Sequence, residues 1–320
     1  MRSFGEIWAP TATGLLVPSG HLSESAGRAR MTFVHAKSSA IELEHLYAES
    51  GLPISPSCPL AKLIDNAKRL SDGWLLNEWD GLTRINAMYS CHLQRIAEAM
   101  LPLATVARRG RYLEHLTSSE LDFFKRGASA AKDVLWELEL WSLLRDAGAP
   151  AELRDPPDIV VPIDYAVLGI ACKKVYSEKN VAKVLSEAVE QVEGEFDVGV
   201  VAVNLDELTP ADHVLKVRTE RDMARMLQAR CDEFVRQHER HLHKYLSTRR
   251  LIAAMVSIHV VAEVEEWNSS FNNCRQSTVW NIPGLAERKQ ALVGHFERMI
   301  LDIPHGSVAS AASQGDARPS

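Results

Sequence analysis

The chain has 320 residues, of which 46% are hydrophobic and 24% are charged, and its formal net charge is −6. This composition, with only 17 Gly and 14 Pro, excludes a collagenous, low-complexity or mainly disordered protein. No uncharged apolar run approaches the roughly 18 residues of a membrane-spanning helix. Because the overall balance is acidic, any contact with nucleic acid needs a local basic patch.

Signals of secretion are missing from the sequence. Residues 1–17 lack the apolar core of a signal peptide. The five Cys are scattered, and no two of them have the CxxC spacing of a zinc or redox motif. These features favour a cytoplasmic protein with free thiols and no membrane partner.

The N-terminal third predicts a loosely held segment followed by helices. Pro and Gly breaks in residues 1–36 predict a poorly ordered or loosely docked segment. Residues 37–116 form the predicted helical N-terminal region, because apolar side chains recur there at helical spacing. The Ser and Thr of Thr117–Glu120 are typical of a helix start. The expected helices of this region cover 41–49, 59–70 and 85–100.

Residues 117–304 predict an α/β domain, and residues 305–320 a flexible tail. The helix expected at 128–147 is apolar nearly all round, which indicates burial. Strands are expected at 151–154, 158–163, 165–175, 198–204 and 251–264, and helices at 178–193, 218–247 and 284–302. This order predicts a mixed sheet flanked by helices, with an α-helical N-terminal extension.

Three polar side chains follow one another in a pattern that can carry chemistry. A carboxylate, Glu137 or Glu139, lies on the buried helix, and only one of the two can face a given site because about 200° of helix rotation separates them. Asp158 opens a strand after two prolines, and Lys173 lies on the next strand. Adjacent strands are about 4.8 Å apart, so an acid and an ammonium can meet there.

Such a group suits the hydrolysis of a phosphodiester. Carboxylate oxygens bind hard divalent cations, which neutralise phosphate charge and activate water. A neighbouring lysine can hold that water and stabilise the developing negative charge. The pattern is therefore the arrangement that a metal-dependent phosphodiesterase needs.

These motifs resemble the PD-(D/E)XK nuclease superfamily, which has the restriction-endonuclease-like fold. The resemblance lies in WELELWSLLRDAG (136–148), PPDIVV (156–161), GIACKK (169–174) and AVEQV (188–192). It implies that Glu137 and Asp158 bind Mg²⁺ or Mn²⁺, that Lys173 assists the water and that Gln191 orients it. It also implies that the substrate is nucleic acid, DNA more than RNA.

One position departs from the family pattern. Ala171 stands where the family has a second strand acid, so one metal ligand is missing. The backbone carbonyl of Cys172 and water molecules could complete the ligand set, or Glu187 or Glu190 of the following helix could replace the lost acid. The alternative is a catalytically inactive nuclease-like module that binds nucleic acid or a protein partner. A homodimer also stays open.

A basic segment, three histidines and one cysteine each have a simpler explanation than a role in chemistry. Residues 216–250 carry ten Lys or Arg against five Asp or Glu, so this helix either follows a phosphate backbone or is an ordinary charged surface. We also expect the helical N-terminal region to contact nucleic acid or a partner. His238, His241 and His243 lack a metal-binding spacing and indicate a solvated helix. Strand alternation predicts that the Cys172 thiol packs in the core and is not a nucleophile.

Overall fold

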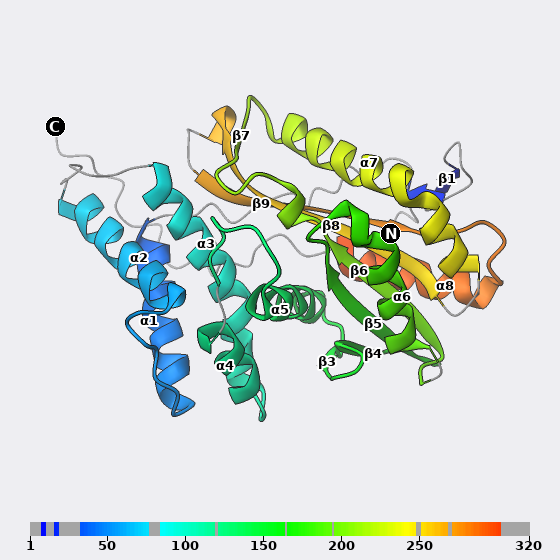
Figure 1. Cartoon of the computed structure of the whole chain (residues 1–320), viewed down its shortest axis with the longest axis horizontal. Helices are drawn as coiled ribbons and strands as arrows, with labels where there is room; N and C mark the ends of the chain where they lie inside the picture. The colour runs from blue at the N-terminus through cyan, green and yellow to red at the C-terminus, as the bar shows by residue number, and fades with distance from the viewer. Residues whose placement is uncertain are drawn as a thin grey trace, which may run out of the picture.

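The computed structural model describes residues 8–10, 16–18, 33–76, 84–118, 121–163, 165–193, 195–247, 251–267 and 271–301. Within these ranges the chain forms a mixed seven-stranded open sheet flanked by helices, and further helices pack at one end of it (Figure 1). The predicted α/β class with an N-terminal helical region is therefore confirmed. The predicted tail, residues 305–320, lies outside the described residues.

In the part of the N-terminal region that the structure describes, there are two short strands and four α-helices. Its elements are β1 (Trp8–Pro10), β2 (Leu16–Pro18), α1 (Phe33–Glu49), α2 (Pro59–Leu76), α3 (Arg84–Met100), a 3₁₀ helix (Leu101–Thr105) and α4 (Gly110–Ser118). Most of the segment predicted to be poorly ordered, 1–36, lies outside the described residues, although β1 and β2 pair antiparallel within it.

The helix start expected at Thr117–Glu120 is wrong, because α4 ends there. The next helix, α5 (Ala130–Asp146), starts later, and the hydroxyl of its N-cap Ser129 accepts a hydrogen bond from the Lys132 amide. Buried indoles fix this helix against the sheet: Trp136 donates to the Ala202 carbonyl at 3.1 Å and Trp141 to the Ala151 carbonyl at 3.0 Å. The predicted burial of α5 is confirmed.

The strands lie in the order β3-β4-β5-β6-β8, with β7 and β9 also paired to β8. They are β3 (Glu152–Leu153), β4 (Ile159–Ile163), β5 (Ala166–Lys174), β6 (Val198–Asn204), β7 (Val214–Val217), β8 (Leu251–Val264) and β9 (Phe271–Trp280). β5, β6 and β8 run parallel, and β4 and β9 pair antiparallel to their neighbours. β7 and β9 were not predicted, because β7 is short and β9 is rich in polar residues.

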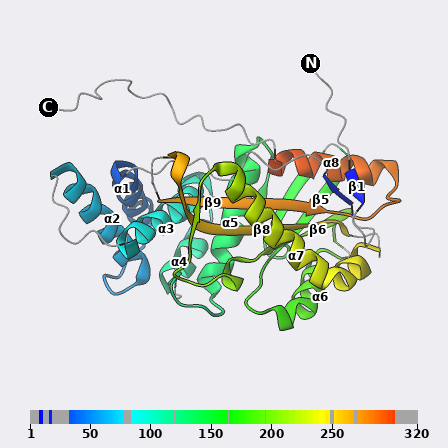
Figure 2. The same cartoon turned by 90° about the horizontal axis from the view of Figure 1, so that it is seen from above.

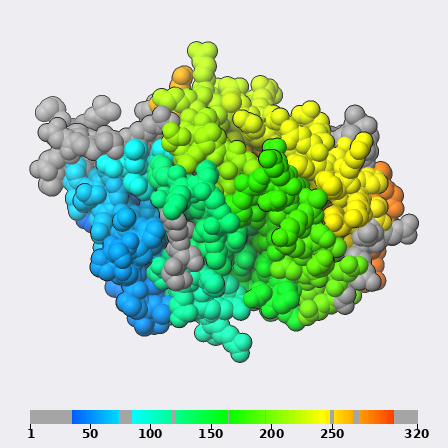
Figure 3. Space-filling view, in the orientation of Figure 1, coloured from blue at the N-terminus to red at the C-terminus, as the bar shows by residue number. Residues whose placement is uncertain are grey.

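Helices cover both faces of the sheet (Figure 2). The remaining helices are α6 (Val181–Val192), α7 (Glu220–Ser247) and α8 (Glu287–Leu301). α5 and α8 share an apolar core with one face of the sheet, and α6 and α7 share another with the opposite face. The first of these cores continues into α1–α4, so the N-terminal helices and the sheet bury a common set of side chains. In the space-filling view the N-terminal helices, blue and cyan, lie directly against the rest of the molecule (Figure 3).

A buried carboxylate joins these parts. β6 and β7 run one after the other along the same edge of β8, and Asp206 lies in the gap between them. Its Oδ1 accepts from the His259 amide of β8 at 2.7 Å, and its Oδ2 accepts from Arg95 of α3 at 2.5 Å. Burial alone would raise the pKa of Asp206, but the Arg95 and Lys174 charges hold it far below its usual range.

Among the described residues, no helix combines the length and the apolarity that crossing a lipid bilayer requires.

Asp206→Asn should lower the free energy of unfolding by about 3 kcal/mol at pH 7, because Arg95 and Lys174 lose a buried anion. A carboxyl with a depressed pKa in the folded state stabilises the protein above its unfolded pKa and stops doing so as the pH falls. The gap between wild type and variant should therefore stay constant from about pH 5 to 8 and narrow below about pH 4. Urea unfolding at several pH values measures the difference in free energy of unfolding, with the exposed Asp65→Asn variant as control. An equal loss of stability in the two variants would contradict the role of Asp206 as a buried anion.

Candidate functional site

The end of β5 is uncovered on the side of β4. The first residue of β4, Ile159, pairs with Ile170, so Ala171–Lys174 extend beyond β4. The Cys172 amide donates instead to Oδ2 of Asp158 at 2.5 Å. The N–H and C=O of one strand residue point to the same side, so the Cys172 carbonyl also faces Asp158. The Asp158 carboxylate and the Cys172 carbonyl therefore lie next to each other just before β4 begins.

Helix α5 brings two more carboxylates to this end of β5. Asp133 and Glu137 lie four residues apart and share one helix face. The Tyr176 hydroxyl, just beyond β5, donates to Oδ1 of Asp133 at 2.8 Å. Asp133 was missed in the sequence, although its spacing from Glu137 could have identified it.

The carboxylates crowd one another. Burial raises the pKa of Glu137 to about 8, and the charges of Asp158 and Asp133 add to the shift. Burial also raises the pKa of Asp158, against the opposing effects of the Cys172 amide and of Lys173. The Lys173 charge opposes the rise in pKa of all three acids, and at Asp133 the Lys174 charge opposes it more strongly. Glu137, Asp158 and Lys173 therefore lie near enough for their charges to affect one another. Strand alternation puts the Lys173 side chain on the face of Ala171, which packs under α6, and Cys172 on the face towards α5.

The choice between the two helix glutamates is settled by their partners. Glu139 is buried, and its carboxylate accepts hydrogen bonds from Nε and from Nη2 of Arg95, the latter at 2.9 Å. This pair lies in the Asp206 network. Glu137 is the acid that faces Asp158, as the helix geometry required of one of the two.

Gln191 is not part of this group. It lies in the last turn of α6, next to Val192, whose side chain packs on Gly199. Gly199 pairs with Gly169, well before Lys173 along β5, and a Cβ on Gly199 would lie only 2.6 Å from Val192. Because α6 runs back from the end of β5 to the start of β6, its C-terminal turn lies away from Asp158.

The two acids that could replace the missing one at Ala171 also lie outside the group formed by Glu137 and Asp158. Glu187 and Glu190 are exposed on α6, and Glu187 pairs with Lys183 at 3.6 Å. Ala171 has no exposed surface and belongs to the apolar core under α6. Neither Glu187 nor Glu190 therefore replaces the acid that Ala171 lacks.

The thiol of Cys172 is buried in the core shared with α5, as alternation predicted. Burial raises its pKa well above the usual range, and the Asp158 and Glu137 carboxylates add to this. A thiol of this kind is a poor nucleophile.

The donor set fits one hydrated, oxygen-binding cation. Glu137 and Asp158 place two crowded carboxylates beside the Cys172 carbonyl, and Mg²⁺ is commonly held by one or two carboxylates with water as its other ligands. Within the described ranges, no group of three or more His, Cys, Asp or Glu is arranged to hold a metal. The site is therefore poorer in carboxylates than the family pattern implies.

No protein-family model, curated protein or solved structure matches this chain.

Glu137→Gln should stabilise the metal-free protein at and above neutral pH. A carboxyl whose pKa is raised by folding costs stability as the pH rises from its unfolded value towards the folded one. In EDTA the gain should be small at pH 5 and on the order of 1–3 kcal/mol at pH 8.

Glu139→Gln is the matched control on the same helix. It should destabilise the protein, because Arg95 loses a buried partner. Urea unfolding at several pH values measures both effects. A loss of stability in Glu137→Gln that grows with pH would contradict the crowding of these acids.

Proposed function

We propose that the chain is a divalent-metal-dependent nuclease of the PD-(D/E)XK type, with a restriction-endonuclease-like core, that hydrolyses phosphodiester bonds of DNA. The observation that supports the proposal is the mutual electrostatic influence of Glu137, Asp158 and Lys173 near the uncovered end of β5. The Cys172 amide fixes one oxygen of Asp158, and its carbonyl faces the same space. Helix, strand end and strand edge each contribute one part, in the order of the sequence motifs.

The site residues have two roles: some would bind the metal ion, and Lys173 contributes a positive charge. Glu137, Asp158 and the Cys172 carbonyl would hold Mg²⁺ or Mn²⁺, which when bound neutralises phosphate charge and lowers the pKa of a water. Lys173 is the ammonium beside these acids and can donate to a phosphate oxygen as charge develops there. Asp133, held by Tyr176, adds to the negative charge that a cation would offset.

Helix α7 supports nucleic acid as the substrate. Its cations, including Arg236 and Arg240, are exposed along the helix. His238, between them, is close enough to Glu178 for that charge to affect its pKa, which burial lowers. Glu178 follows β5 closely, so this part of α7 lies near the chain that leaves the site. Exposed arginines along a helix suit contact with a phosphate backbone.

The second candidate is a nuclease-like module that binds DNA without cleaving it. Ala171 favours it, because a buried alanine in an apolar core gives the site no second strand acid. The two candidates share the fold and the basic helix, and they differ in whether the metal and Lys173 are needed for a reaction.

A plasmid-nicking assay with Mg²⁺ or Mn²⁺ separates them. Wild type should nick DNA, and Lys173→Ala and Asp158→Asn should each lower the rate by about 100-fold or more, because each loses a group that acts on the developing charge. Lys183→Ala is the control, since it removes an exposed lysine, 79% accessible, from α6. It should nick at the wild-type rate.

Wild-type protein that binds DNA in EDTA but cleaves neither DNA nor RNA with metal would establish the binding module. Equal nicking by wild type and Lys173→Ala would contradict both the proposed reaction and the role of this lysine.

A further inference from the structure

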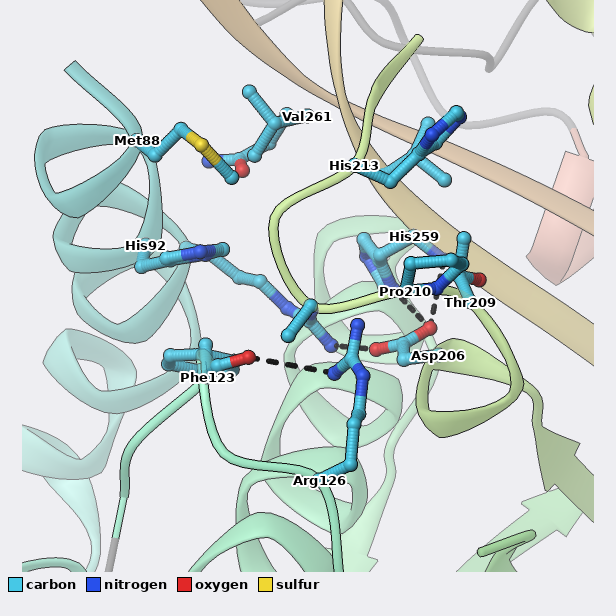
Figure 4. A pocket seen from close by; sticks show the side chains of 14 residues that line it. Met88, His92, Phe123, Arg126, Asp206, Thr209, Pro210, His213, His259 and Val261 are labelled. Atoms are coloured by element: carbon cyan, nitrogen blue, oxygen red, sulfur yellow. Dashed lines mark hydrogen bonds and ion pairs between the residues drawn. The ribbon is translucent and has the colours of Figure 1, made fainter. Parts of the chain in front are cut away.

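A second site lies on the other side of α5, in a pocket lined by α3, the chain before α5, the segment between β6 and β7, and β8 (Figure 4). Its cavity of about 40 Å³ has room for a small group. The residues that matter are Met88, His92, Arg126, Asp206, His259 and Val261. None of them belongs to the Glu137 site.

His92 is the unexplained residue of this pocket. Its side chain is 8% exposed and its ring stacks on Phe123, with centroids 4.4 Å apart. Both ring nitrogens are buried and have no hydrogen-bond partner among the described residues. The Nδ1 of His259 is also buried and has no hydrogen-bond partner among the described residues; it lies 3.8 Å from Oδ1 of Asp206. Buried polar atoms without partners indicate a missing ligand or water.

The charges around His92 select the sign of that ligand. Burial, and after it the positive charges of Arg95 and Arg126, together lower the pKa of His92 to about 3. Asp206 cannot take up a cation, because the His259 amide holds its Oδ1, and Arg95 and Lys174 hold its Oδ2. Two guanidinium groups, those of Arg95 and Arg126, thus line a pocket in which Asp206 has no free carboxylate oxygen, and this favours an anion.

Arg126 provides a donor at the open side of the pocket. Its side chain is 31% exposed, and Nη1 contacts the Phe123 carbonyl at 3.4 Å and Glu207 at 3.2 Å. Lys132 shares Glu207 at 3.0 Å, so the charge of this glutamate is divided between two cations. A guanidinium has five N–H donors, and the other nitrogens of Arg126 can reach a ligand.

We propose that this pocket binds a terminal phosphate group. Arg126 of the loop before α5, His92 of α3 and His259 of β8 approach it from three separate elements, which suits a tetrahedral oxyanion better than a planar carboxylate. Met88 and Val261 form the side opposite Arg126, so the group that carries the phosphate is apolar where it meets them (Figure 4).

Titration with inorganic phosphate at constant ionic strength tests the site in the full chain. The NMR signals of the His92 ring should shift and saturate, and Tm should rise by about 2 °C when phosphate reaches ten times its Kd. His92→Phe keeps a ring on Phe123 and removes both nitrogens, and Arg126→Gln removes the charge. Each should weaken phosphate binding at least tenfold.

Two controls separate this site from other anion binding. Arg154→Gln removes a 52% exposed arginine elsewhere and should bind phosphate as wild type does. Lys173→Ala should also bind normally, so the result is independent of the proposed nuclease. Unshifted His92 signals, phosphate binding that persists in His92→Phe, or acetate that binds as tightly as phosphate would each overturn the proposal.

Discussion

The end of β5 supplies positive charge both to the buried core and to the candidate site. Because β4 starts at Ile159, the last residues of β5 have no strand on that side, and two consecutive lysines there point to opposite faces. Lys174 reaches Asn204 at 2.5 Å and Asp206 at 3.4 Å, inside the protein. Lys173 offsets the charges of the three acids at the uncovered edge. One strand end thus supplies a cation to a structural network and another to a candidate reaction site.

Helix α5 separates these two groups of charges. One of its faces presents Asp133 and Glu137 to the edge of β5, and the other presents Glu139 to Arg95 and the Asp206 network. The structural network is a compensated one, in which each carboxylate oxygen of Asp206 has a buried donor. The Glu137 group is only partly compensated by Lys173, and burial together with the charges of Asp158 and Asp133 raises the pKa of Glu137. Crowded acids of this kind cost stability, and they recur where a cation or a reaction makes use of them.

Much of this could be predicted from the sequence where local spacing determines the outcome. Helix α5, β4, β5, β6 and β8 follow from apolar patterns, and the pairing of β4, which follows Asp158, with β5, which carries Lys173, follows from strand adjacency. Gln191 was misplaced because its position depends on the direction of α6 and on the close packing of Val192 on Gly199, which no local pattern encodes. The network of Arg95, Glu139 and Asp206 was also not predicted. Its members are 44 and 111 residues apart, and only tertiary packing brings them together. β9 was missed because its buried polar side chains, such as Asn272 and Gln276, resemble a loop.

The most direct measurement is an anomalous diffraction map of crystals soaked in Mn²⁺. The account predicts a peak within ligand distance of the carboxylates of Glu137 and Asp158 and of the Cys172 carbonyl, and no such peak in Asp158→Asn crystals. A map in which Mn²⁺ binds elsewhere, or in which Lys173 turns away from these acids, would contradict it.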